Sequence, residues 1–503
     1  MKHIFKPLRN YLQSLDLTSL LGSIYGLSQH LEWNVELPTY LQTANPFRKK
    51  TKTYLGFYLW ELDTLAREAS LHCPDRGGKL VNDWPQVRKA LNLIKDVENT
   101  AYGYADDGSI FSEMGRIAHR QFHWQLSVTH PDLARYGKIY AQDVIRGAVE
   151  SEFEMSTEQV FVGSFGILAS YLHNSAISAD FHINAQNLLG FSVEPLLARC
   201  STTVTKLRSD TKAVQRLDVD WAYTFHPLRL RPILEWPSGI RTCPLTGLLA
   251  RRFTDGLYFD MVKIGDVASS ALGPAFQAYI GEVLTTASLG SFTILPEERF
   301  GSSSLPKDSV DWIVRDKTDD LFLECKILRL AYAGKSELAP TPGIDREHRK
   351  LAKALTKMYL SLELAIQGNY PHWSGDGRPI IPMLVTLDDW KLFTHVVQDS
   401  IDSMVAEELA AAGGDVKLLK RYPYVVCCAK ELEQGIQVMR VQGIHTVLKG
   451  LLAGDRRGWL FSSYLADQFP DQLANVSPLF QMEIDRMLQS VLPMWGTRSR
   501  NLN

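Results

Sequence analysis

The segment Ser309–Lys326 constrains the fold of this chain more than any other, because it places charges inside runs that otherwise have the pattern of buried strands. Two β-rich runs, Val310–Val314 and Leu321–Leu328, flank the polar stretch Arg315–Asp320. A short polar stretch between two such runs predicts a hairpin of antiparallel strands. Charges inside such a buried-looking strand are costly unless each has a partner or a metal.

The charged side chains of the second strand share one face. Side chains alternate along a strand, so Glu324 and Lys326 lie on the same face as Phe322. Asp311 opens the neighbouring strand, where antiparallel pairing would bring its carboxylate beside Glu324. Two converging carboxylates make an oxygen-ligand site suited to Mg²⁺, which binds one or two carboxylates plus water and phosphate oxygens. The Lys326 ammonium can then position an attacking water and stabilise developing negative charge.

The elements around this hairpin predict a sheet covered by helices. Apolar residues at helical spacing predict a helix over Phe276–Ala287, followed by a β-rich run at Phe292–Leu295. After the hairpin come a long helix at Asp345–Ile366 and two apolar runs, Ile380–Leu387 and Tyr424–Cys428. The order helix, three strands, helix, strand, strand is typical of an α/β sandwich.

The chain of 503 residues is too long for one ordinary domain, since single cores stop growing beyond roughly 250–300 residues. Residues 1–230 have mainly helical patterns. Prolines and glycines cluster at 227–248, which predicts a loop-rich boundary. We therefore expect a mixed α+β or α/β chain: a helical N-terminal domain at 1–230, an α/β sandwich domain at 231–454, and C-terminal helices at 455–503 that end in a loose tail at 496–503.

Composition excludes several classes of protein. There are 54 Lys and Arg residues against 56 Asp and Glu, a formal net charge of −2. Nucleic-acid binding would therefore require a local basic patch rather than a basic surface. Six Cys residues without repeated CxxC spacing make neither a disulfide framework nor a zinc pattern. No run reaches 18 uninterrupted apolar residues, so we expect a cytoplasmic protein without a membrane span.

The charged hairpin resembles the active-site segment of the PD-(D/E)XK nuclease superfamily. The match consists of Asp311, twelve intervening residues, and the sequence Glu324-Cys325-Lys326. The resemblance covers roughly residues 273–430 and implies a nuclease that uses Mg²⁺, or Mn²⁺ in its place, with DNA favoured as the substrate. It also implies that Asp311, Glu324 and an acidic residue on the preceding helix, Glu282, bind metal, while Lys326 positions water. One departure is Val310, where the family often has proline.

The helix after the hairpin carries a row of cations. Arg346, Lys350, Lys353 and Lys357 fall on one face, and a separate apolar stripe would pack against the sheet. Cations near the carboxylates could contact a phosphate backbone. A solvated helix face produces the same pattern.

Other interpretations of these residues remain open from the sequence. An ordinary hairpin with a surface Asp311 and a cross-strand Glu–Lys pair would produce the same residues. A nuclease fold without catalysis would serve as a binding or scaffold protein. A third interpretation is a protein-interaction hub centred on the helices of residues 1–230; in a nuclease, these helices would support recognition, self-association or a partner protein. By analogy alone, a nuclease segment joined to a large non-catalytic half is typical of a prokaryotic antiviral defence effector.

Overall fold

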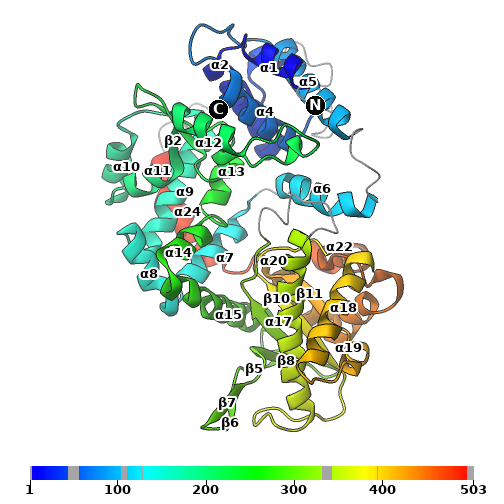
Figure 1. Cartoon of the computed structure of the whole chain (residues 1–503). Helices are drawn as coiled ribbons and strands as arrows, with labels where there is room; N and C mark the ends of the chain where they lie inside the picture. Colours follow the sequence, from blue (N-terminus) through cyan, green and yellow to red (C-terminus); the bar gives the residue numbers. More distant parts are fainter. Residues whose placement is uncertain are drawn as a thin grey trace.

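A computed structural model describes residues 3–42, 56–102, 110–125, 128–330, 342–392 and 395–495 (Figure 1). The predicted mixture of helices and sheets is confirmed. Helices predominate before residue 265, and a five-stranded sheet lies in the following part of the chain.

The first part of the chain is mainly helical, as its patterns predict. At the start of α9 (Thr157–His173), Ser156 and Gln159 cap each other's backbone N–H groups, which have no partner within the helix. Among the described residues, none of the helices has the length and apolar character needed to cross a membrane. The other helices of this part are α1 (Lys6–Leu12), α2 (Leu17–Trp33), α3 (Thr39–Gln42), α4 (Leu59–His72), α5 (Trp84–Tyr102), α6 (Ile110–Gln125), α7 (His130–Tyr140), α8 (Asp143–Phe153), α10 (Phe181–Leu189), α11 (Glu194–Cys200), α12 (Val204–Val214), α13 (Thr246–Arg252) and α14 (Leu257–Ile264).

Residues 266–428 contain the five-stranded sheet and the helices on its two faces. The elements are α15 (Asp266–Ser288), β5 (Thr293–Pro296), β8 (Trp312–Arg315), β9 (Asp320–Lys326), α17 (Pro342–Ile366), β10 (Ile380–Thr386) and β11 (Val425–Cys428). The strand order is β11-β10-β9-β8-β5. Strands β5, β8 and β9 are antiparallel neighbours, whereas β9, β10 and β11 run parallel. The predicted hairpin is therefore confirmed. The predicted elements follow one another in the expected order, but the structure adds two short strands before β8 and two helices between β10 and β11.

The two faces of the sheet pack against different helices. Leu323 and other side chains on the same face of the sheet, such as Val314 and Met383, belong to a large apolar cluster that includes residues of α15. Ile313 and Phe322 belong to a second cluster, formed with α17 and α18 (His395–Ala411). Alternation along the strands places Asp311 on the face of Ile313 and Glu324 on the face of Phe322. Both carboxylates therefore lie on the α17 face of the sheet.

The apolar clusters do not divide the chain at residue 230. The first helices pack with residues such as Leu228 and Leu248. The large cluster joins residues between 128 and 200 to α15, the sheet and Val491. The last helix, α24 (Gln481–Trp495), also packs against α9. The predicted boundary rested on turn residues, which mark loops, whereas a domain boundary needs few contacts across it. The predicted tail at 496–503 lies outside the described residues.

Two small sheets were not predicted, because the strands of one are mostly exposed and those of the other have only two or three residues each. One is a hairpin inserted between β5 and β8, and the other joins segments around residues 176–242. Their strands are β6 (Arg299–Ser302) with β7 (Leu305–Asp308), and β1 (Ala176–Ile177), β4 (Arg241–Thr242), β3 (Ile233–Glu235) and β2 (Ser201–Thr203). The remaining helices are α19 (Lys417–Arg421), α20 (Ala429–Gln442), α21 (Ile444–Leu452), α22 (Phe461–Gln468) and α23 (Pro470–Ala474).

Candidate active site

The structure brings Asp311 and Glu324 together at the centre of the sheet. Trp312 pairs with Leu323, so continuing this antiparallel register places Asp311 directly opposite Glu324. Both residues are buried, with 6% and 8% of their surface exposed. The backbone N–H of Cys325 donates a hydrogen bond of 2.6 Å to Asp311 Oδ2. The local cause is the hairpin itself, which fixes the two carboxylates on adjacent strands.

Lys326 completes the group at the end of β9. Its Nζ lies 2.5 Å from Glu324 Oε1, and a third of its side chain is exposed. Burial lowers the pKa of this ammonium, but the carboxylates of Glu324 and Asp311 outweigh burial, so the pKa is raised overall. Lys326 therefore stays charged next to the carboxylate pair while its end reaches solvent.

The two carboxylates carry more negative charge than their surroundings balance. Burial, together with the charge of Glu324, raises the pKa of Asp311 to about 7. Burial also raises the pKa of Glu324, although Lys326 partly offsets this effect. A buried carboxylate with a raised pKa favours a bound proton or a further cation. The site thus has an electrostatic demand for positive charge.

The oxygen donors of this pair fit a hard divalent cation such as Mg²⁺ or Mn²⁺. Asp311 and Glu324 together would balance the two positive charges of the ion. The single charge of Lys326 does not balance both carboxylates. Within the described parts of the chain, no group of three or more His, Cys, Asp or Glu side chains is placed to hold a metal. The fit therefore rests on two carboxylates, with water or phosphate oxygens as the remaining ligands.

Glu297 is a third carboxylate near the site, and the sequence pattern did not point to it. It follows β5, and the register of β5 and β8 places it next to Asp311. Besides burial, its charge helps to raise the pKa of both Asp311 and Glu324. Its exposed carboxylate accepts a hydrogen bond of 3.0 Å from Gln277. Because the β6–β7 hairpin separates the two strands in sequence, their register was not evident from spacing.

Glu282, the acidic residue predicted on the helix before the sheet, is not brought to the other carboxylates. Lys138 Nζ lies 2.9 Å from its Oε2, and Gln142 Nε2 donates to its Oε1 at 2.6 Å. Its helix, α15, covers the face toward which Trp312 points, and Trp312 and Asp311 alternate on opposite faces. Helical spacing placed Glu282 correctly at the flank of the apolar stripe of α15, but it could not reveal that Lys138 on α7 pairs with Glu282.

The predicted row of cations extends away from the site along α17. Burial raises the pKa of Glu324, and Lys357 is one of the cations that partly offset this, so it lies close to the site. Arg346, Lys350 and Lys353 line a separate shallow pocket nearer the start of the helix. The four residues span roughly 16 Å of the helix axis. Only Lys357 therefore stands beside the carboxylates, and the other three continue the row.

Tyr370 supports the loop that delivers Asp311. Its hydroxyl accepts a hydrogen bond of 2.9 Å from the N–H of Val310 and lies 2.6 Å from Ser361 Oγ on α17. Burial raises its pKa to about 12, so the hydroxyl keeps its proton near neutral pH. Tyr370 lies 60 residues after Val310 and belongs to no sequence motif, so its role is visible only in the structure.

Comparison with known proteins finds no matching family model, no similar curated protein and no similar solved structure. The chemistry of the site is therefore argued from its geometry. Two adjacent carboxylates can hold a divalent cation, and an ammonium beside them can orient water. Such a combination can activate water and stabilise negative charge in a phosphoryl group.

Proposed function

We propose that this protein is a Mg²⁺-dependent nuclease that hydrolyses phosphodiester bonds of nucleic acid, with DNA as the favoured substrate. The observation that carries the proposal is the buried pair Asp311 and Glu324 beside Lys326, with the pKa of Asp311 raised to about 7 by burial and by Glu324. A pair of this kind is suited to a divalent cation and is costly without one. The order of helices and strands agrees with the resemblance to PD-(D/E)XK nucleases.

Each residue of the candidate active site would have a distinct role. Asp311 and Glu324 would provide oxygen ligands, and the N–H of Cys325 orients the first of them. When bound, the ion would polarise a phosphoryl oxygen and lower the pKa of a bound water. Lys326 donates to Glu324 and has further N–H groups that can orient the attacking water and balance developing charge.

The substrate would lie along α17. Lys357 stands nearest the carboxylates, and Lys353, Lys350 and Arg346 continue the row toward the start of the helix. Successive cations along one face can contact successive phosphates of a strand that leads away from the bond being cleaved. These contacts would be sensitive to salt, because binding releases counterions from the nucleic acid.

The test is a calorimetric titration of the full chain with Mn²⁺ and Mg²⁺, followed by cleavage assays on DNA and RNA. Glu324→Gln and Asp311→Asn keep the shape of each side chain but remove one ligand charge. We expect both variants to lose metal binding and cleavage. Asp308→Asn is the matched control, because this exposed carboxylate lies three residues before Asp311 and pairs only with Arg299 among the described residues.

Two outcomes would contradict the proposal. Metal binding and cleavage that survive in Glu324→Gln would show that the site has been assigned to the wrong residues. Metal binding by the unaltered protein without cleavage of DNA or RNA would favour the alternative, a catalytically inactive binding or scaffold protein. Glu282→Gln adds a finer distinction: from its contacts with Lys138 and Gln142, we expect metal affinity close to that of the unaltered protein.

A further inference from the structure

A large cavity, separate from the candidate active site, lies where the first helices meet the helices before the sheet. Its volume is about 1000 Å³. Its walls come from α4, α6, α8, α11, α12, α13 and α14, from the segment 222–231 between α12 and α13, and from five residues after β9 and β10: Arg329, Leu330, Asp388, Asp389 and Lys391. Asp311, Glu324 and Lys326 are not among the described residues that line it. A cavity of this volume can enclose a ligand of nucleotide size.

The cavity wall is basic, although the chain as a whole is not. Among the described lining residues, eleven are Lys or Arg and seven are Asp or Glu. The whole chain has a formal net charge of −2. An excess of cations on a concave, low-dielectric wall concentrates positive potential and attracts anions. The charge of the wall therefore indicates an anionic ligand.

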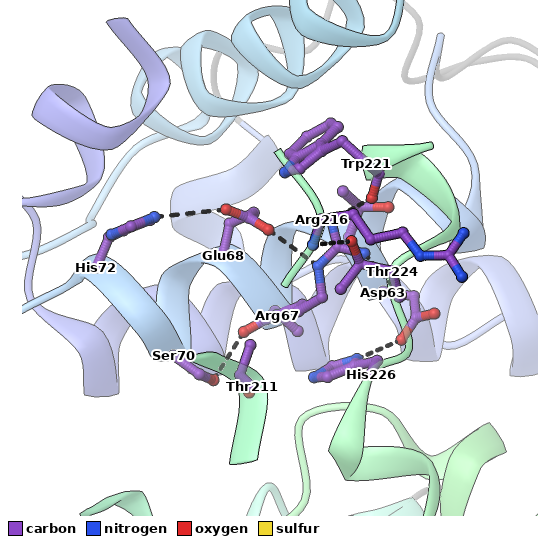
Figure 2. A network of polar contacts seen from close by, with 12 residues as sticks. Asp63, Arg67, Glu68, Ser70, His72, Thr211, Arg216, Trp221, Thr224 and His226 are labelled. Atoms are coloured by element: carbon purple, nitrogen blue, oxygen red, sulfur yellow. Dashed lines mark hydrogen bonds and ion pairs between the residues drawn. The ribbon is translucent and has the colours of Figure 1, made fainter. Parts of the chain in front are cut away.

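The part of the wall contributed by α4 is fixed by a polar network (Figure 2). Arg67 donates a hydrogen bond of 2.9 Å to the carbonyl of Thr224. Asp63 lies 2.6 Å from His226 Nδ1. Asp63 also accepts a hydrogen bond of 2.7 Å from Arg229. These contacts join α4 to a segment more than 150 residues later in the chain. A wall that is already ordered reduces the entropic cost of binding a ligand.

Aromatic rings lie beside the cations on another part of the wall. The Arg329 guanidinium lies 5.0 Å from the ring centroid of Tyr258 and 5.1 Å from that of Phe259. Arg329 also forms an ion pair of 2.8 Å with Asp388, which holds it in place. Phe259 is nevertheless 47% exposed. An exposed aromatic ring among cations is suited to stacking on a nucleobase.

Two cations of the wall are open to a ligand. Arg231 and Lys263 are exposed, and neither forms an ion pair with another residue in the described parts of the chain. Several other cations of the wall have carboxylate partners, for example Arg252 with Asp260. An anion would therefore bind Arg231 and Lys263 without first breaking an ion pair.

We propose that this cavity binds a nucleotide. Its phosphates would contact Arg231 and Lys263, and its base would stack on Phe259. Guanidinium groups form paired hydrogen bonds with phosphate oxygens, and an ammonium acts on phosphate as a point charge. Phe259, Arg231 and Lys263 line the same cavity, as a ligand that carries both a base and phosphates requires.

The experiment is calorimetric titration of the full chain with ATP, tripolyphosphate and adenosine, in EDTA and in the Asp311→Asn background. These conditions remove divalent metal from the candidate active site, so a failure of the proposed nuclease function does not affect the result. We expect ATP to bind more tightly than tripolyphosphate or adenosine. The double variant R231E/K263E should weaken ATP binding by at least tenfold, and Phe259→Ala should weaken ATP binding but not tripolyphosphate binding.

The matched control is R9E/K212E, which reverses two exposed cations outside the cavity and should leave ATP binding unchanged. Circular dichroism and thermal unfolding of each variant show whether it is folded. Absence of ATP binding would overturn the proposal, as would ATP binding that R231E/K263E leaves intact. A decathymidylate that binds more tightly than ATP, and loses binding in R231E/K263E, would assign the cavity to a nucleic-acid strand and would also overturn it.

Discussion

The candidate active site and the basic cavity have opposite charges and opposite ways of balancing them. At the active site, two buried carboxylates lie beside the Lys326 ammonium, and the pKa of Asp311 rises to about 7 through burial and the charge of Glu324. In the cavity, cations outnumber carboxylates among the described lining residues, and two of them are exposed without ion pairs. The charge of the first site therefore favours a cation, and the charge of the second favours an anion.

The two sites also differ in how they are built. Asp311, Glu324 and Lys326 come from one hairpin, so local pairing alone brings them together. The cavity requires helices from the first 265 residues together with the segments after β9 and β10. The hairpin site therefore needs only the sheet and its covering helices, whereas the cavity needs the packing of distant segments.

The largest effect that we predict comes from separating these segments. A fragment of residues 231–503 contains every predicted metal ligand but loses residues 128–200, which belong to the same apolar cluster as α15 and one face of the sheet. Exposure of that apolar surface should make the fragment aggregate or unfold, because burial stabilises by about 25 cal/mol per Å². Ultracentrifugation and circular dichroism measure this.

Coexpression of residues 1–230 and 231–503 as two chains is the control, since it restores the missing half of the cluster. We expect the two chains to purify together. A soluble 231–503 fragment that unfolds cooperatively by itself would instead establish the boundary at 227–248 as a true domain boundary.

The next effect separates the two sites chemically. Glu324→Gln should reduce Mn²⁺ affinity by at least about a hundredfold, because a buried ligand charge is lost at a site with two carboxylates. The same variant should bind ATP normally, since Glu324 is not among the described residues that line the cavity. Calorimetry with each ligand gives both values. Loss of both ligands together would indicate a folding defect rather than two independent sites.

A pH titration sharpens the assignment of Asp311. Metal binding requires the deprotonated carboxylate, whose pKa is raised to about 7 by burial and by Glu324. Mn²⁺ affinity should therefore rise by about tenfold per pH unit below pH 7 and level off above it. An ordinary surface carboxylate would give a flat profile over this range. A Mn²⁺ affinity that is constant between pH 5.5 and pH 7 would contradict the raised pKa that burial and Glu324 give Asp311.

The sequence predicted those features that depend on neighbours along the chain. Strand alternation and the short hairpin were sufficient to place Asp311, Glu324 and Lys326, and the helical spacing of residues 345–366 predicted α17. Glu297 and Tyr370 were not predicted, because each reaches the site through pairing or packing with an element distant in sequence.

Glu282 shows a different limit. Its position on α15 follows from the apolar spacing, but its carboxylate is held by Lys138 and Gln142, which lie about 140 residues earlier. The cavity shows the same limit on a larger scale, because its cations form no motif in the sequence. Long-range packing, rather than propensity, decides where these side chains point.

A smaller effect tests the row of cations on α17. Lys357→Ala should lower the affinity for DNA by several-fold and reduce the log–log salt slope by about 0.9, the value for one phosphate contact. Its matched control is Lys212→Ala, an exposed cation on α12. Fluorescence anisotropy at several salt concentrations measures both. Equal slopes for the unaltered protein and Lys357→Ala would make this row an ordinary solvated helix face.

The smallest effect that we predict is on the stability of the metal-free protein. Asp311 has an ordinary pKa of 3.8 when unfolded and a pKa of about 7 when folded, raised by burial and by Glu324, so the folded state holds its proton more tightly. Stability must therefore fall as pH rises from about 4 to about 7, because ionising Asp311 favours the unfolded chain. Asp311→Asn removes this penalty while its amide oxygen can still accept the hydrogen bond from Cys325.

Thermal unfolding in EDTA should show Asp311→Asn melting a few degrees higher than the unaltered protein at pH 8 and at nearly the same temperature at pH 4, where both side chains are neutral. Asp308→Asn is the control, because its exposed carboxylate has a pKa lowered by the hydrogen bond from Arg299, so neutralising it should not stabilise the protein at pH 8. Saturating Mn²⁺ should reverse the order at pH 8, since only the unaltered protein keeps both carboxylates and gains the stability of metal binding. A lower melting temperature for Asp311→Asn at pH 8 without metal would mean that the Asp311 carboxylate is already balanced by charges within the chain, and the requirement for a divalent cation would lose its physical basis.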